Sequence, residues 1–464
     1  MDPQIGIIGL GTMGANLARN AARNGAKVVV YNRSAEKTDE FMSQYGKEGM
    51  IEGYKSYKEL VQVLTPPRPI LIMVKAGEAV DSVIDELREH LSPGDILIDG
   101  GNSNFEDTQR RYDNLKKSGL KFIGMGVSGG EEGALNGPSM MAGGDNDAYD
   151  EVDELLNRMA ADDGVGGKCV SLLGPGGAGH FVKMTHNGIE YGVMQLIAES
   201  FDLLKRIGGF DNDQLAETFE AWRDSDELSS YLLEITAEIF GSKSDVLDAI
   251  KDQAGQKGTG KWTTSAALHY GVAIPTINAS VDARIISGSE SERKSGKNFP
   301  VSLDEQDPVP PPMKFRSIVR HAYELSMLLT YMQGILLIKK ANEDEKWGID
   351  MGEVVRIWRG GCIIRSSVLG RLQNAFGKDE GKVKAGKQAI MERFQGDRQM
   401  DFRRTLVFAS SRGIPTPAMS ASLNYWDALR SETLPQNLIQ AQRDFFGNHG
   451  FERVDKEGEY HIDS

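Results

Sequence analysis

The chain has 464 residues, of which 40% are hydrophobic, 26% charged and 8% aromatic; this composition excludes a disordered or collagen-like chain, and the length predicts two large domains with a smaller appendage. A formal net charge of -14 argues against duplex nucleic acid or an anionic membrane surface as the main partner. Two cysteines are too few for a secreted disulfide framework, so we expect a cytoplasmic protein with a small-molecule substrate.

Short apolar runs alternate with helix-like segments in the N-terminal part of the chain, and no secretory signal precedes them. Gly, Pro or polar residues bound each run, which is the pattern of a parallel, doubly wound sheet. We therefore predict an α/β Rossmann-type domain over residues 1–178. The predicted strands are Ile5–Gly9, Lys27–Tyr31, Ile70–Val74, Ile96–Asp99 and Phe122–Gly124.

A Gly-x-Gly-x-x-Gly motif follows the first predicted strand and precedes a helix-like segment that ends at Gly25. In this setting Gly9 makes the tight turn, Gly11 lets the backbone approach a pyrophosphate, and Gly14 allows close packing of helix on strand. A glycine-rich turn without a ligand is the alternative. We predict a dinucleotide site that includes Gly9, Leu10, Gly11, Thr12, Met13 and Gly14.

The second predicted strand ends in Asn32-Arg33-Ser34, where NAD enzymes normally carry an acidic residue for the ribose 2′-hydroxyl. No carboxylate stands there to repel a 2′-phosphate. Arg33 can stack on adenine and pair with phosphate, and Asn32 and Ser34 can donate hydrogen bonds. We predict NADP as the cofactor, with Arg33 as an ordinary solvated charge being the alternative.

Helical patterns dominate the chain after Leu173–Gly179, a Gly- and Pro-rich segment that predicts a hinge beside a ligand cleft. We predict an all-helical domain over residues 179–434. The longest apolar stretch, Leu325–Ile338, is interrupted by polar residues and is too short for a bilayer, so it predicts a buried helix and no membrane partner. The predicted helices cover residues 179–207, 213–223, 228–240, 315–342, 352–358 and 383–395.

Two irregular stretches interrupt the helical patterns. Gly288–Asn298 carries charged residues among Ser and Gly, and Asp307–Pro312 cannot be helical inside because of its prolines. Both predict surface loops. Residues 435–464 are predicted to form a tail that is too small for a core of its own.

Polar residues with helical spacing follow the predicted hinge: Lys183, His186, Asn187, Glu190 and Tyr191 share one helix face. A lysine serves as a base near neutral pH only when desolvation or neighbouring cations lower its pKa. A base for a hydroxyl proton, beside a nicotinamide that takes hydride, carries out alcohol oxidation, and Glu190 can supply an acid for a further proton step. We predict Lys183 and Glu190 as the catalytic pair; a solvated face is the alternative.

The segment His186–Gln195 closely resembles the signature of the decarboxylating 6-phosphogluconate dehydrogenases, in the β-hydroxyacid dehydrogenase superfamily, and the likeness runs over essentially the whole chain. Supporting segments are Met73–Gly77, Asp99–Ser103, Gly126–Ala134, Gly258–Thr263, Gly360–Ser366 and Ala441–Gly447. The resemblance implies that NADP oxidises 6-phospho-D-gluconate at C3, that the 3-keto acid loses CO2, and that protonation yields ribulose 5-phosphate in the pentose phosphate pathway.

Residue by residue, the resemblance implies that Lys183 is the base in oxidation and the acid in decarboxylation, and that Glu190 protonates C1. It implies a homodimer in which the tail reaches the partner's site, and no metal is required because the C3 ketone accepts the electrons that CO2 leaves. The implied ligands are Ser128, Gly129, Gly130 and His186 for the carboxylate end, Asn102 and Asn187 for the hydroxyls and nicotinamide, Tyr191, Lys261, Thr263, Arg284 and Arg443 for the phosphate with His449 nearby, and Val74, Lys75 and Ala76 for the cofactor.

Asp282 departs from the family pattern and brings an anion near the expected phosphate site. Two alternatives remain. Another β-hydroxyacid dehydrogenase, of the 3-hydroxyisobutyrate type, shares the Gly-rich motif and the lysine but lacks counterparts of Glu190 and of the Arg443 tail. A non-catalytic NADP-binding protein is the second alternative, and the presence of both Lys183 and Glu190 argues against it.

Overall fold

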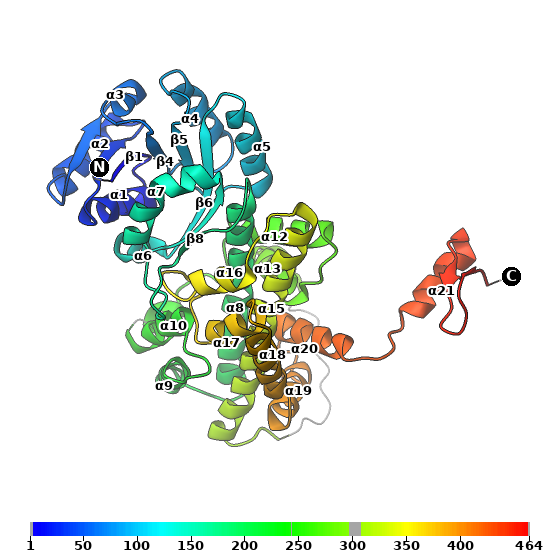
Figure 1. The fold of residues 1–464 in the computed structure, drawn as a ribbon. Helices are drawn as coiled ribbons and strands as arrows, with labels where there is room; N and C mark the ends of the chain where they lie inside the picture. The colour runs from blue at the N-terminus through cyan, green and yellow to red at the C-terminus, as the bar shows by residue number, and fades with distance from the viewer. Residues whose placement is uncertain (1–2, 243, 297–307, 463–464) are drawn as a thin grey trace.

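A computed structural model describes residues 3–242, 244–296 and 308–462. An α/β domain stands above a larger helical domain, and the C-terminal tail extends away from both (Figure 1). This arrangement confirms the predicted fold class.

An eight-stranded sheet in the order β3-β2-β1-β4-β5-β6-β7-β8 forms the centre of the first domain. The ladder from β3 to β6, which contains the five predicted strands, is parallel as predicted. The sequence did not predict β7, which runs antiparallel to β6. From β1 to β3 each new strand is added toward one edge of the sheet, and from β4 to β6 toward the other edge. Rossmann-type sheets bind ligands at the point where this direction changes, between β1 and β4. The strands are β1 Gln4–Ile8, β2 Lys27–Tyr31, β3 Ile51–Tyr54, β4 Pro69–Ile72, β5 Ile96–Asp99, β6 Lys121–Ser128, β7 Ser139–Gly144 and β8 Val170–Leu172.

Helices cover both faces of this sheet. Because successive strand side chains point to opposite faces, Val28 and Val30 join one apolar core while Val29 joins the other. The helices of this domain are α1 Thr12–Arg23, α2 Ala35–Tyr45, α3 Tyr57–Gln62, α4 Glu78–Arg88, α5 Phe105–Lys116, α6 Gly130–Asn136 and α7 Asn146–Met159.

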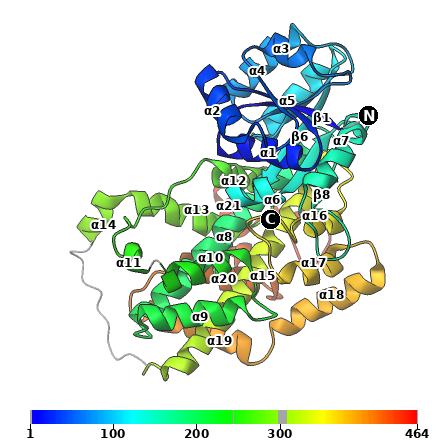
Figure 2. The same ribbon diagram turned by 90° about the vertical axis from the view of Figure 1, so that its left-hand side faces the viewer.

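Two long helices, α8 (Ala178–Arg206) and α15 (Pro312–Glu345), run through the middle of the second domain, and both are largely buried (Figure 2). This confirms that Leu325–Ile338 is part of a buried helix. In the described residues, no helix is long and apolar enough to cross a membrane. The other helices are α9 Asn212–Arg223, α10 Tyr231–Ser242, α11 Ser244–Leu247, α12 Thr259–His269, α13 Pro275–Gly288, α14 Glu290–Gly296, α16 Met351–Ile357, α17 Val368–Phe376, α18 Glu380–Arg393, α19 Asp397–Ser410 and α20 Pro417–Leu429.

The prediction of a surface loop at Gly288–Asn298 is wrong for most of this segment, because α14 occupies Glu290–Gly296. Acidic residues in the first turn of α14 and basic residues in its last turn favour the helix dipole. Residues 297, 298 and 307 lie outside the described part. Residues 308–311 are non-helical as predicted, and Pro312 begins α15.

The two domains are joined by more than the predicted hinge. Arg356 of α16 donates to the Asp163 carboxylate at 2.8 Å and to the Lys168 carbonyl at 2.7 Å, both in the segment before β8. The Ser139 amide of β7 donates to the Gly361 carbonyl at 2.9 Å. The outer strands of the sheet are therefore fixed to the helical domain.

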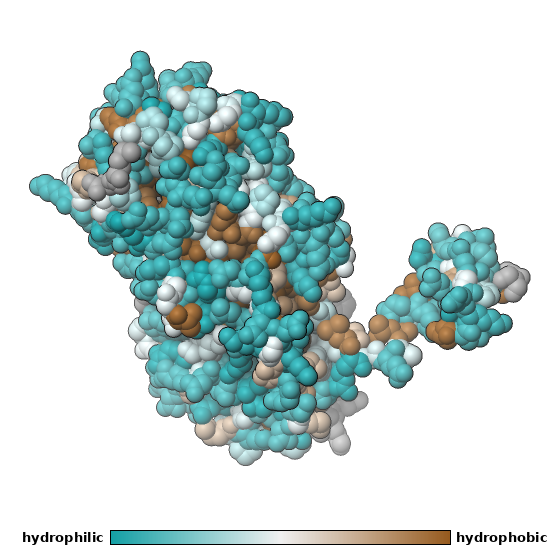
Figure 3. Space-filling model, viewed as in Figure 1, coloured by the Kyte–Doolittle hydropathy of each residue, from teal (hydrophilic) through white to brown (hydrophobic). Residues whose placement is uncertain are grey.

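The tail consists of α21 (Gln436–Gly447) and a short hairpin, β9 (Phe451–Glu452) and β10 (Glu459–Tyr460). Asp444 organises it by accepting hydrogen bonds from the amides of Gly450 and Ile462. Apolar surface gathers where the tail leaves the body and on the near side of the tail (Figure 3). The exposed apolar residues there include Leu434, Leu438, Ile439, Phe445 and Phe446.

Candidate active site

The start of α8 packs against β6 so closely that polar side chains on this helix face are buried. Lys183 is 6% exposed and His186 is fully buried. Gly126 of β6 permits this approach, because a Cβ atom at that position would lie 2.2 Å from the Cβ of Lys183. The predicted polar face of this helix therefore exists, but it packs against the sheet and is not exposed to solvent.

A continuous chain of hydrogen bonds orients these side chains. The Lys183 ammonium group donates to Oδ1 of Asn187, and Nδ1 of His186 approaches the same oxygen at 3.2 Å. Because an amide oxygen only accepts, Nδ1 of the neutral imidazole carries the proton, and Nε2 accepts from the Ser128 hydroxyl at 3.2 Å. The Ile363 amide donates to that hydroxyl at 3.4 Å.

Burial shifts three titrating groups away from their charged forms. It lowers the pKa of Lys183, with the Glu190 carboxylate opposing the shift, and it raises the pKa of the Glu190 carboxyl, with Lys183 opposing it. Burial, reinforced by Lys183, holds the pKa of His186 well below its usual value. Both shifts favour the neutral forms, in which an amine can act as a base and a carboxyl as an acid.

The polar face meets two loops of the sheet domain. The Asn187 amide donates to Oδ1 of Asn102 at 3.4 Å, which brings two predicted sugar ligands together. Gly129 has φ of 131°, and a Cβ there would lie 2.5 Å from the Gly361 carbonyl oxygen, so only glycine fits. Gly130 follows with φ of 63° and begins α6.

Two of the predicted phosphate ligands are assembled further along α8. The Arg284 guanidinium lies over the Tyr191 ring, 3.5 Å from its centroid. Lys261 is exposed on α12. Thr263 is fully buried, and its hydroxyl donates to the Met184 carbonyl at 3.0 Å, while a Cβ added at Gly188 would lie 2.7 Å from its methyl carbon. Thr263 therefore packs α12 onto α8.

Arg443 and His449 are not brought to this cluster within one chain. Both are exposed on the tail, which stands away from the body (Figure 1). Arg443 donates to Gln440 at 2.9 Å, and the His449 ring contacts Phe446. The set of phosphate ligands that the resemblance implies is thus incomplete in a single chain.

The Gly-rich motif has the geometry that the sequence predicts. Gly9 has φ of 98°, and a Cβ at Gly14 would lie 1.9 Å from the Gly9 carbonyl oxygen, so helix and strand meet closely. A Cβ at Gly11 would touch nothing within 4 Å, and α1 begins there without a side-chain cap. Its first amides are free for an anion, so the residues fit a dinucleotide pyrophosphate.

The residues after β2 are partly engaged with each other. Oδ1 of Asn32 accepts from the Leu10 amide at 3.0 Å and its amide donates to the Ser34 carbonyl, so Asn32 links the two loops. The Ser34 hydroxyl donates to the Glu36 carboxylate at 2.7 Å. Arg33 is exposed beside them, as is Lys75 after β4, whereas Val74 and Ala76 are half-buried.

Sequence reasoning missed several buried polar residues beneath the site. His180 contacts the Gly101 carbonyl with Nε2 at 3.1 Å and Thr108 with Nδ1 at 2.7 Å. Asp99 and Arg111, which are 0% and 2% exposed, pair at 3.2 Å. The signal was present, since Asp99 ends an otherwise apolar strand, but nothing in the sequence paired it with Arg111.

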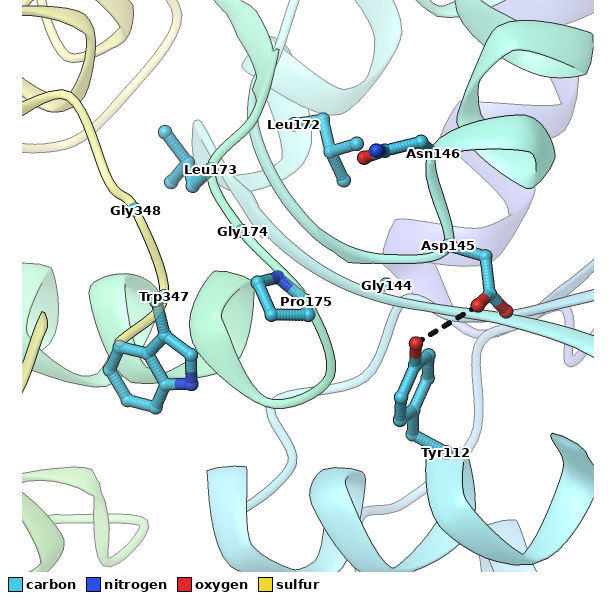
Figure 4. A pocket seen from close by; sticks show the side chains of 10 residues that line it. All are labelled: Tyr112, Gly144, Asp145, Asn146, Leu172, Leu173, Gly174, Pro175, Trp347 and Gly348. Carbon is cyan, nitrogen blue, oxygen red and sulfur yellow. Dashed lines mark hydrogen bonds between the residues drawn. The ribbon is translucent and has the colours of Figure 1, made fainter. Parts of the chain in front are cut away.

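A separate hollow of about 480 Å³ lies at the domain junction, lined by the segment Leu172–Pro175, by Tyr112 and Asp145, and by Trp347 and Gly348 from the loop after α15 (Figure 4). Gly144 borders it, and β7 pairs Gly144 with Ile123, so the hollow lies at the opposite end of β6 from Ser128. Within the described residues, no group of three or more His, Cys, Asp or Glu side chains could hold a metal ion.

Comparisons with known proteins cover both domains. Residues 4–174 match the model of the NAD binding domain of 6-phosphogluconate dehydrogenase, and residues 179–464 match the model of its C-terminal domain. The chain is 48% identical to the decarboxylating 6-phosphogluconate dehydrogenase of Synechococcus elongatus over 99% of this chain and 98% of the relative. It is 46% identical to the NADP(+)-dependent, decarboxylating enzyme of Bacillus subtilis, over 99% and 98%.

A solved structure gives the same result. The 6-phosphogluconate dehydrogenase of Plasmodium falciparum, described in its apo form, with its cofactor NADP+ and with its substrate 6-phosphogluconate, superimposes with a TM-score of 0.92 at 42% identity. The match covers 99% of each chain. Together with the family models, this extent of similarity decides the family: the chain belongs to the 6-phosphogluconate dehydrogenases.

Proposed function

We propose that this protein oxidises 6-phospho-D-gluconate with NADP and decarboxylates the product to D-ribulose 5-phosphate and CO2. Relatives of this name match the chain over its full length, which favours this reaction over that of a 3-hydroxyisobutyrate-type enzyme. The observation that carries the proposal is the pair on α8, a buried lysine with lowered pKa and a half-buried carboxyl with raised pKa. A non-catalytic binding protein has no need of that pair.

In the oxidation, Lys183 acts as the base. Its neutral amine accepts the proton of the C3 hydroxyl while the hydrogen on C3 leaves as hydride, and bound NADP supplies the hydride acceptor. The hydrogen bond to Asn187 fixes the amine in position. Burial lowers the pKa of the amine and so favours the deprotonated form that acts as the base.

In the decarboxylation, Lys183 returns the proton. The bond between C1 and C2 breaks, and CO2 departs. The electron pair of that bond moves toward the C3 ketone, and the Lys183 ammonium protonates the ketone oxygen. The product is an enediol between C2 and C3. Glu190, whose pKa burial raises, then delivers a proton to the carbon that lost CO2, which becomes C1 of ribulose 5-phosphate. At the same time the neutral amine of Lys183 takes back the proton of the hydroxyl on the neighbouring carbon, which becomes the C2 ketone.

We expect the remaining predicted ligands to hold the substrate against this pair. Ser128, His186 and the backbone of Gly129 and Gly130 would hold the substrate carboxylate. Asn102 and Asn187 would orient the hydroxyls and the nicotinamide. The phosphate would be bound by Tyr191, Lys261 and Arg284, with Thr263 acting through the packing of α12.

The cofactor would lie along the carboxyl ends of β1, β2 and β4. The motif from Gly9 to Gly14 would hold the pyrophosphate, and Val74, Lys75 and Ala76 would border the nicotinamide half. Arg33 would bind the 2′-phosphate, because it is exposed beside Ser34 and lacks an ion pair among the described contacts. Asn32 would set the position of Arg33 through its bond to Leu10.

We further propose a cytoplasmic homodimer in which each tail completes the partner's site with Arg443 and His449. The exposed apolar residues of the tail support this, since they have no cover in a single chain. We also propose domain boundaries at residues 178 and 434, so that 1–178 binds cofactor, 179–434 binds substrate and forms the dimer, and 435–464 forms the tail.

Mixed dimers test the shared site. Lys183→Ala and Arg443→Ala should each be inactive alone. In a dimer of one chain of each kind, one site has the native Lys183 of one chain and the native Arg443 of the other, so co-expression should restore activity. Restoration contradicts a site built within one chain, and its absence contradicts the shared site.

Substrate choice tests the reaction itself. With NADP+ and 6-phosphogluconate the protein should form NADPH, and with 3-hydroxyisobutyrate it should not. The opposite preference would favour the shorter dehydrogenases, and inactivity with both would favour a binding protein.

A further inference from the structure

Two loops at neighbouring strand ends meet beneath the site. Residues 73–77 follow β4 and carry the proposed cofactor residues, and residues 100–104 follow β5 and carry Asn102. β4 and β5 are paired in parallel, so their carboxyl ends lie at the same edge of the sheet. The loops are in contact, because a Cβ at Gly101 would lie 3.4 Å from the Val74 carbonyl oxygen.

One buried guanidinium bonds to the first loop directly and to the second loop through Asp99. Arg111 of α5 is 2% exposed, and its Nη2 donates to the Gly77 carbonyl at 3.0 Å at the end of the first loop. Its Nη1 donates to Asp99 at 3.2 Å. Its Nε and Nη2 also donate to the two oxygens of Asp81 at 2.8 and 2.9 Å, so α4 holds the guanidinium plane in a fixed orientation.

Asp99 transmits this contact to the second loop. Its Oδ1 accepts from the Gly101 amide at 3.0 Å, and its Oδ2 accepts from the Ser103 hydroxyl at 2.7 Å. These residues flank Asn102, whose side chain meets Asn187 of α8. His180 adds a second tie, because its Nε2 donates to the Gly101 carbonyl at 3.1 Å.

We propose that Arg111 is a positioning residue that couples the cofactor loop 73–77 to the substrate loop 100–104, so that binding of one ligand changes the affinity for the other. The inference rests on the proposed function. A displacement of either loop alters the hydrogen bonds of the same planar group, and its fork geometry lets it serve Gly77, Asp81 and Asp99 at once. A lysine at this position has one nitrogen and cannot reach all three.

The neighbouring Arg110 offers a matched control. It also donates to Asp81, at 3.1 Å to each oxygen, but it is half-exposed and contacts neither loop. The hydrogen bond from Arg111, followed by that from Arg110, lowers the pKa of Asp81 to about 2, so both partners are charged at neutral pH. Arg110→Lys therefore disturbs the same carboxylate and the same helix without touching the loops.

The test measures NADPH binding by its fluorescence, with and without saturating 6-phosphogluconate. NADPH already carries its hydride, so the substrate is not consumed. In the native protein and in Arg110→Lys, the substrate should change the NADPH dissociation constant by about fivefold or more, whereas in Arg111→Lys the change should fall below about twofold. A native-sized change in folded Arg111→Lys, or no change in the native protein, overturns the inference.

A second variant covers the case in which Arg111→Lys does not fold. Arg111→Met combined with Asp99→Asn removes both charges, so neither remains buried without its partner, and the new amide oxygen still accepts from Gly101. This variant should also show a change below about twofold, and a native-sized change contradicts the coupling role. A native protein that binds neither ligand refutes the proposed function, and with it the inference.

Discussion

Gly126→Ala is the sharpest test of how the sheet positions Lys183, the proposed catalytic base. The added Cβ would lie 2.2 Å from the Cβ and 2.6 Å from the Cγ of Lys183, whereas ordinary contacts begin near 3.4 Å. The lysine must therefore retreat by about 1.2 Å. A misplacement of about 1 Å lowers a rate by about 100-fold, and overpacking of this kind destabilises a fold by about 1–3 kcal/mol.

The assay compares kcat, NADP affinity and thermal stability with those of Gly386→Ala. In that control a Cβ would lie 2.6 Å from the Ala375 nitrogen, between α17 and α18. Both variants should lose stability, but only Gly126→Ala should lose about 100-fold in kcat with NADP binding retained. Equal losses of kcat in the two variants, or a normal kcat in Gly126→Ala, refute the reasoning.

Three further predictions follow from burial and charge. Lys183→Met should abolish turnover yet raise Tm at pH 7. Burial lowers the pKa of Lys183 in the folded protein, so below pH 10.5 the unfolded lysine binds a proton more readily than the folded one, and the fold loses stability as the pH falls. An unchanged Tm contradicts this. Burial raises the pKa of Glu199 to about 7, so native stability should fall by up to about 3 kcal/mol as the pH rises from 4.5 to 7, and urea titrations of Glu199→Gln should show a smaller fall. Asn32→Asp should lower the ratio of NADP to NAD activity in initial-rate assays, and an equal ratio speaks against the proposed 2′-phosphate site.

The strands that the sequence predicts are those whose own residues favour a sheet. Lys27–Tyr31 contains three consecutive valines and a tyrosine, which favour strands, and its bounds match β2. β7 escaped prediction because Ser139–Gly144 contains Met, Ala and Gly, which have little strand preference, and its place depends on pairing with β6. Its antiparallel direction is a tertiary property that local patterns do not carry.

The proposed catalytic face of α8 was predictable because helical spacing alone places Lys183 and Glu190 on the same side of the helix. Its surroundings were not. That Thr263 packs on Gly188, or that Asp99 pairs with Arg111, depends on contacts between segments far apart in the chain. The position of the tail illustrates the same limit, since the sequence predicts that residues 435–464 are too few for a core of their own but does not predict where they lie relative to the body.

The most direct test of the central claim is the stoichiometry of the reaction run in deuterated water. The native protein with NADP+ and 6-phosphogluconate should release one CO2 for each NADPH formed, and the ribulose 5-phosphate should carry one deuterium at C1, delivered by Glu190. In Lys183→Met both products should be absent while NADP binding persists. NADPH without CO2, or undiminished turnover in Lys183→Met, would contradict the account.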